Sequence, residues 1–170
     1  MADKRHIRVL IIEDDEFITM VYRDQLSDVS DIEFELDVYT LLYDGLDALE
    51  KNEYDVLLLD LNLPDSDYNN TIEKIPSIAY KLPIVIMTSA NDEVLALKTM
   101  NKGGQDYLVK SKLDRALFIR SVLYSIERHQ LRNQLQQEKE KSDILLRNIL
   151  PESIAEELKL NGSIKARHYD

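Results

Sequence analysis

Reactive side chains follow four apolar runs of the sequence, at the point where each run ends. The third run, residues 56–59, ends at Asp60. Glu13 and Asp14 follow residues 9–12, Thr88 follows residues 84–87, and Lys110 follows residues 107–109. Buried parallel strands read as continuous apolar runs, and ligands of open parallel sheets bind beyond the carboxyl ends of the strands. We therefore expect these side chains to meet at one edge of a sheet.

The residue types at this edge predict phosphoryl chemistry that depends on a metal. Three carboxylates, from Glu13, Asp14 and Asp60, would repel one another unless a cation lay among them, and hard oxygen ligands favour Mg²⁺. Such an ion keeps open positions for phosphate, which Lys110 can pair with as a point charge and Thr88 can reach with a hydroxyl hydrogen bond. Asp60 is then placed to act as the nucleophile and form an aspartyl phosphate.

The elements that would position these groups alternate along the chain. Strands are expected near residues 7–12, 33–39, 55–61, 83–87 and 106–109, and helices near 16–27, 44–51, 68–80 and 92–101. This order is typical of βαβ units, and it predicts a doubly wound α/β domain with a five-stranded parallel sheet. The second strand differs from the others because residues 33–38 alternate between polar and apolar types.

A long helix is predicted to follow the last strand. Residues 111–114 resemble a capping box, and no Gly or Pro appears from there until Pro151, so one helix of about 55 Å fits. A seven-residue template places Leu117, Ser121, Tyr124, Arg128, Leu131, Leu135, Glu138, Ser142, Leu145 and Ile149 at core positions. This imperfect seam favours a marginal two-stranded coiled coil, and hence a homodimer. The alternative is an amphipathic helix that folds back on the domain.

Composition excludes several classes of function. The chain of 170 residues has no cysteine, which excludes disulfides, thiol catalysis and thiolate metal sites. No apolar stretch approaches the roughly 20 residues that span a bilayer, and a signal-peptide core is absent, so we expect a cytoplasmic protein with no membrane partner. Residues 1–110 carry 10 Lys and Arg against 23 Asp and Glu, whereas residues 111–170 carry 11 against 9. Neither part resembles a basic surface that binds nucleic acid.

Taken together, residues 6–125 resemble a response-regulator receiver domain, which implies a flavodoxin-like fold. The resemblance implies the following roles: Glu13 and Asp14 as the acidic pair, Asp60 as phosphoacceptor, Thr88 as switch hydroxyl, Tyr107 as switch aromatic, Lys110 as the site lysine, and Asn62 as donor of a backbone carbonyl to the metal. It further implies Mg²⁺ as cofactor and a histidine kinase or phosphotransfer protein as partner. Ser111 departs from the family, in which Pro usually follows the lysine.

A second resemblance concerns the tail. Residues 142–159 and 164–170 are similar to the signalling helix and transducer segment that precede class III adenylate or guanylate cyclase domains. The implied organisation is a receiver at 1–125, a signalling helix at 126–150 and a transducer segment at 151–170 leading to an output domain. None of the metal-binding aspartates of a cyclase domain is present, so no cyclase activity is expected from these residues.

Other interpretations of the same residues fit less well. A haloacid-dehalogenase-type phosphatase needs a second Asp where this chain has Asn62, and an EF-hand needs ligand spacing that residues 13–16 lack. The segment 129–132 is faintly similar to a histidine-kinase phosphoacceptor box, but a solvent-facing His129 is the simpler interpretation. A DNA-binding regulator would need a helix-turn-helix after residue 130. Three alternatives stay open: a degenerate receiver that serves as a dimerisation scaffold, a diguanylate cyclase output and a histidine kinase output.

Overall fold

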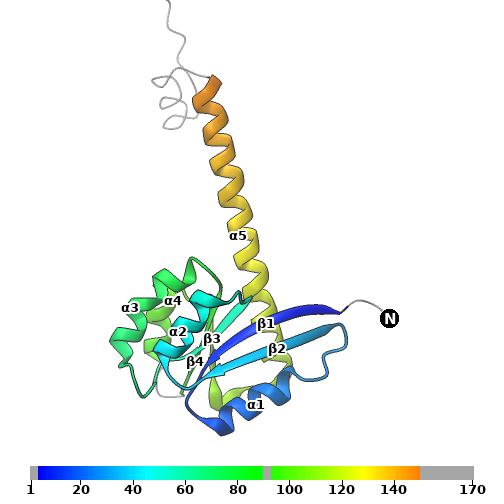
Figure 1. Ribbon diagram of the computed structural model, residues 1–170, viewed down its shortest axis with the longest axis vertical. Coiled ribbons are helices and arrows are strands. Elements are labelled where there is room, and N and C mark those ends of the chain that lie inside the picture. Colours follow the sequence, from blue (N-terminus) through cyan, green and yellow to red (C-terminus); the bar gives the residue numbers. More distant parts are fainter. Residues whose placement is uncertain (1–3, 90–92, 150–170) are drawn as a thin grey trace, which may run out of the picture. The chain divides into compact units, whose positions relative to one another are not determined.

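The central element is a five-stranded parallel sheet, which confirms the predicted doubly wound α/β fold (Figure 1). The computed structural model describes residues 4–89 and 93–149. The strands are β1 (Arg5–Ile12), β2 (Ile32–Tyr39), β3 (Val56–Asp60), β4 (Ile84–Thr88) and β5 (Asp106–Val109). They lie in the order β2-β1-β3-β4-β5, so the chain runs from β1 to one edge of the sheet and then crosses to the other side. This order creates a switch point between β1 and β3, where ligands of such sheets bind.

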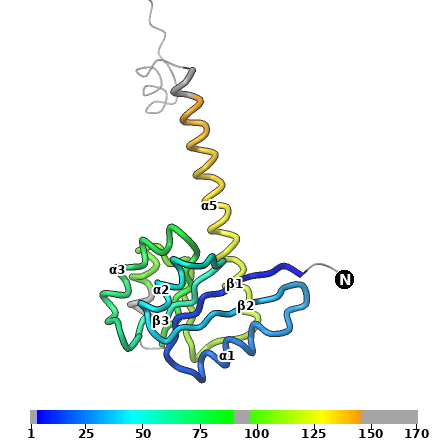
Figure 2. Tube along the Cα trace, viewed as in Figure 1, coloured from blue at the N-terminus to red at the C-terminus, as the bar shows by residue number. Residues whose placement is uncertain are grey.

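Helices cover both faces of the sheet (Figures 1 and 2). They are α1 (Glu16–Leu26), α2 (Leu42–Lys51), α3 (Tyr68–Ala79), α4 (Glu93–Met100) and α5 (Arg115–Ile149), with a 3₁₀ turn, η1 (Lys110–Lys112), before α5. Helices α2 and α3 lie over one face, α1 and the beginning of α5 over the other, and α4 lies against β4 and β5. Among the described residues, none of these helices combines the length and apolar character needed to cross a bilayer.

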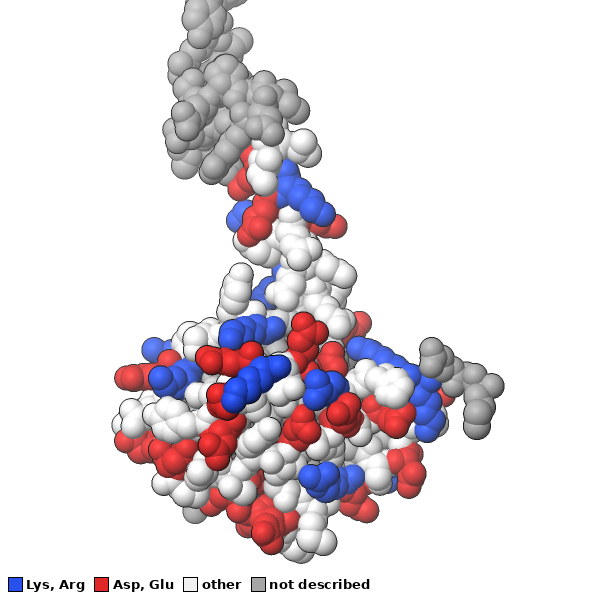
Figure 3. Space-filling model, in the orientation of Figure 1, with Lys and Arg blue, Asp and Glu red and all other residues white. Residues whose placement is uncertain are grey.

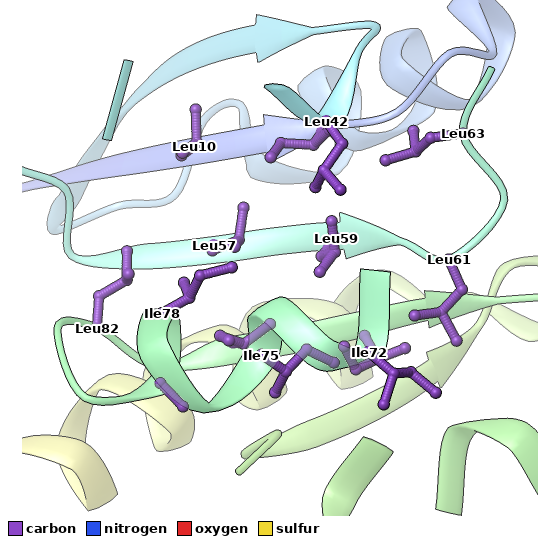
Figure 4. Close-up of a cluster of buried hydrophobic side chains, with 14 residues drawn as sticks. Leu10, Leu42, Leu57, Leu59, Leu61, Leu63, Ile72, Ile75, Ile78 and Leu82 are labelled. Atoms are coloured by element: carbon purple, nitrogen blue, oxygen red, sulfur yellow. The ribbon is translucent and has the colours of Figure 1, made fainter. Parts of the chain in front are cut away.

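Strand β3 supplies both hydrophobic cores, which explains its continuous apolar sequence. Leu57 and Leu59 point into the cluster under α2 and α3 (Figure 4). Val56 and Leu58 point into the cluster under α1 and α5. Because successive side chains of a strand alternate between faces, a central strand that is covered on both faces has no polar position until it reaches its end. Asp60 is that end.

Strand β2 alternates because it is an edge strand with only one well-covered face. Phe34 and Leu36 pack against the α1–α5 cluster. On the other face, Arg8 of β1 forms ion pairs with two carboxylates of β2. Its Nε lies 3.5 Å from Glu35 Oε2, and its Nη2 lies 3.2 Å from Asp37 Oδ2. Charges on an edge strand also discourage pairing with other chains.

Helix α5 belongs to two compact units of the chain, Met1–His129 and Gln130–Asp170. In the first unit, Phe118, Val122 and Ile126 of α5 are buried in the hydrophobic cluster between the sheet, α1 and α5. In the second unit, the large apolar side chains of α5 whose burial is described are exposed: Leu131, Leu135, Ile144 and Leu145. The predicted transducer segment, residues 151–170, lies outside the described residues.

The predicted start of the long helix was wrong by one turn. Residues 110–112 form the 3₁₀ turn, Leu113 is extended with φ −67° and ψ 115°, and α5 begins at Arg115. Asp114 caps the helix instead of Ser111, since its Oδ2 accepts a hydrogen bond of 3.1 Å from the backbone N–H of Leu117. The extended residue interrupts the helix that a capping box at Ser111 would have started.

Three further expectations for α5 are corrected by the fold. His129 is only 5% exposed, so it is not a solvent-facing histidine. Ser121, a predicted seam position, is buried and its Oγ donates a 2.6 Å hydrogen bond to Asp106 Oδ2. Arg128, another seam position, donates a 3.0 Å hydrogen bond to the backbone oxygen of Gln105. Ser121 and Arg128 thus contact Asp106 of β5 and the preceding residue, Gln105. The seam positions from Leu131 to Leu145 are all exposed.

The surface of the first unit carries charges of both signs. On the face drawn in Figure 3, Asp and Glu side chains outnumber Lys and Arg and lie among them. This distribution agrees with the excess of 32 Asp and Glu over 21 Lys and Arg in the chain.

Candidate functional site

The ends of three strands bring the predicted charged groups together. Glu13 follows β1, Asp60 is the last residue of β3, and Lys110 follows β5. Lys110 Nζ lies 2.6 Å from Glu13 Oε2 and 2.7 Å from Asp60 Oδ2. One ammonium group therefore bridges two carboxylates that lie far apart in the sequence. The parallel sheet makes this contact possible because it places all carboxyl ends at one edge.

Glu13, Asp14 and Asp60 form a cluster that can hold a divalent cation. One carboxylate oxygen from each residue lies within 4.8 Å of the others. Glu13 and Asp60 are buried, whereas Asp14 is exposed, so the cluster opens to solvent on one side. Three carboxylates and an open side match the needs of Mg²⁺, which binds few protein oxygens and retains water.

Burial and charge shift the ionisation of these groups. Burial raises the pKa of Glu13, repulsion from Asp60 raises it further, and the hydrogen bond from Lys110 opposes both. For Lys110, burial alone would lower the pKa, but the hydrogen bonds to Asp60 and Glu13 outweigh it and raise the pKa. The lysine therefore stays protonated and offsets part of the negative charge of the cluster.

Tyr22 is a site neighbour that the sequence analysis missed. Its hydroxyl donates a 3.3 Å hydrogen bond to Glu13 Oε2. The ring is fully buried and stacks on Phe118 with 5.3 Å between ring centroids. Burial, followed by the charge of Glu13, raises the pKa of the Tyr22 hydroxyl, which therefore remains a donor. Ile18, Tyr22 and Leu26 are spaced by four residues, so they lie on one face of a helix, and this spacing predicts that the Tyr22 ring points inward. It does not predict which strand end the Tyr22 hydroxyl reaches.

The remaining predicted site residues lie around the same edge. The Asn62 backbone N–H donates a 3.3 Å hydrogen bond to Asp60 Oδ1, and the Asn62 side chain is exposed. Thr88 is buried at the end of β4, and its Oγ1 donates a 3.2 Å hydrogen bond to the Ser89 carbonyl. Tyr107 is half-buried on β5, where it pairs with Ile86 of β4. In this structure the Thr88 hydroxyl thus contacts the following loop.

The parallel sheet, its switch point and the acidic cluster at the strand ends define a flavodoxin-like class of α/β domain. The family model of the response regulator receiver domain matches residues 9–120. The chain therefore belongs to the response regulator receiver family.

Two relatives illustrate how this domain is used in longer proteins. The chain is 30% identical over 125 residues to a protein-glutamate methylesterase/protein-glutamine glutaminase of Thermotoga maritima. This match covers 69% of this chain and 34% of that protein. It is 32% identical over 104 residues to a probable transcriptional regulatory protein of Sinorhizobium fredii, and this match covers 61% of this chain and 44% of that protein. The chain thus spans less than half the length of these curated relatives.

Solved structures share the fold. The signal receiver domain of a putative LuxO repressor protein from Vibrio parahaemolyticus has a TM-score of 0.65 at 22% identity, with 76% of this chain and 97% of that chain covered. The receiver domain of the sensor histidine kinase PA1611 from Pseudomonas aeruginosa has a TM-score of 0.60 at 21% identity, with 72% and 98% covered. That second structure has a magnesium ion coordinated in its active-site cleft.

Proposed function

We propose that this chain is a phosphorylation-controlled receiver in which Asp60 accepts a phosphoryl group. The observation that carries the proposal is the bridge that Lys110 Nζ makes to both Glu13 and Asp60 at the strand ends. A lysine held there neutralises the charge that develops when a carboxylate oxygen attacks phosphorus. The donor is a phosphohistidine of a histidine kinase or phosphotransfer protein, the partner class that response regulators use.

The acidic cluster fits Mg²⁺ as the cofactor. Glu13, Asp14 and Asp60 supply carboxylate oxygens. The resemblance to receiver domains implies that the backbone carbonyl of Asn62 supplies a further, neutral oxygen. The ion provides charge neutralisation at the phosphoryl oxygens when it is bound. The donor set contains only oxygen, which fits this ion better than a softer metal. The magnesium found in the cleft of the Pseudomonas receiver supports the assignment by analogy.

In the transfer step, the residues of this chain act around the carboxylate of Asp60, and the bound cation would offset charge at the phosphoryl oxygens. A carboxylate oxygen of Asp60 attacks phosphorus, a new O–P bond forms, and the N–P bond to the partner's imidazole breaks. The electron pair of that bond returns to the imidazole nitrogen, which takes up a proton. Lys110 keeps contact with the growing negative charge, and Thr88 turns from the Ser89 carbonyl to a phosphoryl oxygen. Tyr107 then occupies the space that Thr88 leaves, which gives the domain two states.

The helix beyond the receiver is proposed to join two copies of the chain. Its support is the exposure of Leu131, Leu135 and Leu145, which recur at the spacing of a coiled-coil seam. In this proposal residues 1–125 form the receiver, residues 126–150 the signalling helix and residues 151–170 a transducer that leads to a nucleotidyl cyclase output. Support for that output is the sequence of residues 142–170 alone, so a diguanylate cyclase or histidine kinase output competes with it.

Binding of beryllium trifluoride, an analogue of the phosphoryl group, tests the proposal. Fluorine NMR should detect a bound adduct only when Mg²⁺ is present. Asp60→Asn removes the nucleophile and Asp14→Ala removes a metal ligand, so each should abolish the adduct, while Asp47→Asn, an exposed carboxylate on α2, should leave it intact. An adduct that survives Asp60→Asn would refute the assignment of the acceptor.

The same experiment separates the receiver from a degenerate scaffold. A scaffold would dimerise through the helix and bind neither Mg²⁺ nor the analogue. Sedimentation of the wild-type chain with and without the analogue then shows whether association depends on the site. The specific feature that favours a working receiver is the complete set of charged groups at the strand ends.

A further inference from the structure

Helix α2 is capped by Asp65, a residue 23 positions further along the chain than Leu42, whose backbone N–H donates to it. The helix's own N-cap residue, Leu41, has an apolar side chain that makes no capping hydrogen bond. Asp65 supplies the cap instead: Oδ1 accepts a 2.8 Å hydrogen bond from the backbone N–H of Leu42, and Oδ2 accepts a 3.0 Å bond from that of Tyr43. Both carboxylate oxygens are thus used on the free N–H groups of one helix end.

Asp65 belongs to the loop of residues 61–67, which directly follows Asp60. The loop contains a tight turn in which the Ser66 N–H donates a 3.3 Å hydrogen bond to the Leu63 carbonyl. Pro64 occupies the second position of this turn, where its fixed φ is favoured. Asp65 is therefore presented by a turn of defined shape, and the side chains of Leu63 and Leu42 share one apolar cluster beside it (Figure 4).

The far end of the loop is fixed to helix α3. Asp67 caps α3 locally, since its Oδ1 accepts a 2.9 Å hydrogen bond from the Asn70 N–H. The buried hydroxyls of Ser66 and Thr71 lie 2.9 Å apart and hydrogen-bond to each other. The near end is attached to the acceptor through the Asn62 N–H and Asp60 Oδ1. One short loop thus links the acceptor, the start of α2 and the start of α3.

We propose that Asp65 is a positioning residue for the cation site: it ties the loop that carries Asn62 to the start of α2, so that α2 and the site stabilise each other. This inference rests on the proposed function, because it needs a cation among Glu13, Asp14 and Asp60. With the loop held at Asp65, Asn62 is three residues from a fixed point, and its carbonyl keeps its place. Without Asp65 the loop retains its attachment to α3 but loses its attachment to α2.

The charge of Asp65 suits this task. Burial would raise the pKa of its carboxyl group, but the backbone hydrogen bonds from Tyr43 and Leu42 outweigh burial and lower it. The group therefore stays ionised at the amino-terminal end of α2, where negative charge is favoured. Because coupling between two sites is reciprocal, occupancy of the cation site must strengthen the α2 cap by the same factor as the cap strengthens cation binding.

The test is a Mg²⁺ titration of the full chain, without any phosphoryl donor, combined with amide hydrogen exchange. Asp65→Ala should weaken Mg²⁺ binding about fivefold, the lower range of allosteric coupling. Asp67→Ala is the matched control: it removes the same charge from the same loop, but uncaps α3 only, so its affinity should stay within about twofold of wild type. In the wild type, Mg²⁺ should slow exchange of the Leu42 and Tyr43 amides.

Each outcome decides the matter. Unchanged Mg²⁺ affinity in Asp65→Ala, or equal losses in both variants, would reduce Asp65 to a structural cap without a role in positioning the site. If Asp65→Ala does not fold, two measurements replace it: Mg²⁺ binding to Asp65→Asn, which keeps one acceptor oxygen, and hydrogen exchange of the wild-type Leu42 and Tyr43 amides. Exchange rates of these amides that do not change with Mg²⁺ would then overturn the proposal. Failure of the acceptor assignment itself would give a different result. The beryllium trifluoride adduct would form in Asp60→Asn, while in the wild type Mg²⁺ would still slow exchange of the Leu42 and Tyr43 amides.

Discussion

Two parts of helix α5 have the same backbone structure but opposite surroundings. From Arg115 to His129 the helix buries Phe118, Val122 and Ile126 in the receiver core. After His129, the apolar side chains of Leu131 and Leu135 are exposed. The first part is stabilised by its own domain, while the second part exposes a stripe that a second chain would cover.

This difference shows that one helix can combine a buried part and an exposed part, of which the proposed dimer would use only the exposed part. In the first part, buried positions recur at spacings of four, as expected for a helix that lies on a sheet. The second part keeps a repeat of seven with apolar residues at Leu131, Leu135 and Leu145. Polar residues at Glu138 and Ser142 interrupt that seam. Association through it should therefore be weaker than the packing of the receiver core.

The largest expected effect comes from the core part of the helix. Phe118→Ala removes a fully buried ring that stacks on Tyr22, and should lower the free energy of unfolding by about 3–5 kcal/mol. Leu135→Ala, at a site that is 67% exposed, should change the unfolding of the receiver by less than about 0.5 kcal/mol. Urea denaturation followed by circular dichroism measures both. Equal losses would mean that the second part of α5 also stabilises the receiver.

The seam should show the opposite behaviour. Replacing both Leu131 and Leu135 with Asn removes apolar area from the proposed dimer, and should weaken dimerisation by more than about tenfold. The stability of the receiver should not change. Sedimentation equilibrium over a concentration series provides the measurement, and Gln137→Asn, at an exposed position outside the seam, serves as control. A weak coiled coil is expected to associate at concentrations on the order of tens of micromolar. A wild-type chain that stays monomeric at these concentrations contradicts the proposed geometry.

A smaller effect is expected where α5 meets β5. Ser121→Ala removes the buried hydrogen bond to Asp106 and should lower the free energy of unfolding by about 1 kcal/mol. Ser142→Ala is the matched change in the second part, where the side chain is exposed, and should have almost no effect. If the two variants unfold at the same denaturant concentration, the Ser121 contact does not hold the helix to the sheet.

The smallest expected effect is a change in pH dependence. The folded chain holds the proton of Glu13 more tightly than the unfolded chain, whose carboxyl has its ordinary pKa of 4.5. Since the folded state then binds more protons, this group makes stability fall as the pH rises above 4.5 towards the raised pKa. Glu13→Gln should flatten this decline, and so should added Mg²⁺, whereas Glu138→Gln in the second part should not. An unaltered slope in Glu13→Gln would contradict the shift.

The order of the elements and the charged cluster could be predicted because few rules determine them. Apolar runs mark buried strands, and parallel strands bring their ends to one edge, so Glu13, Asp60 and Lys110 had to be neighbours. The burial of His129 could not be predicted in the same way, since it depends on how far α5 follows the sheet. The cap that Asp65 provides for α2 joins residues 23 positions apart, and no local pattern announces it.

The start of α5 illustrates the same limit. Ser111 and Asp114 are both suitable helix caps by residue type. The choice between them depends on the extended backbone of Leu113 after the turn that carries Lys110. Residue type alone does not distinguish them, and the predicted cap at Ser111 was wrong because the backbone is extended at Leu113.

The most direct test of the central claim is to find the residue that carries the phosphoryl group. The full chain is incubated with a small acyl phosphate and Mg²⁺, the acyl phosphate bond on the protein is trapped by borohydride reduction, and the modified peptide is identified by mass spectrometry. We predict modification at Asp60 alone, lost when Mg²⁺ is chelated and strongly reduced in Lys110→Ala. Modification at another carboxylate, or at Asp60 to the same extent without a divalent cation, would contradict the account.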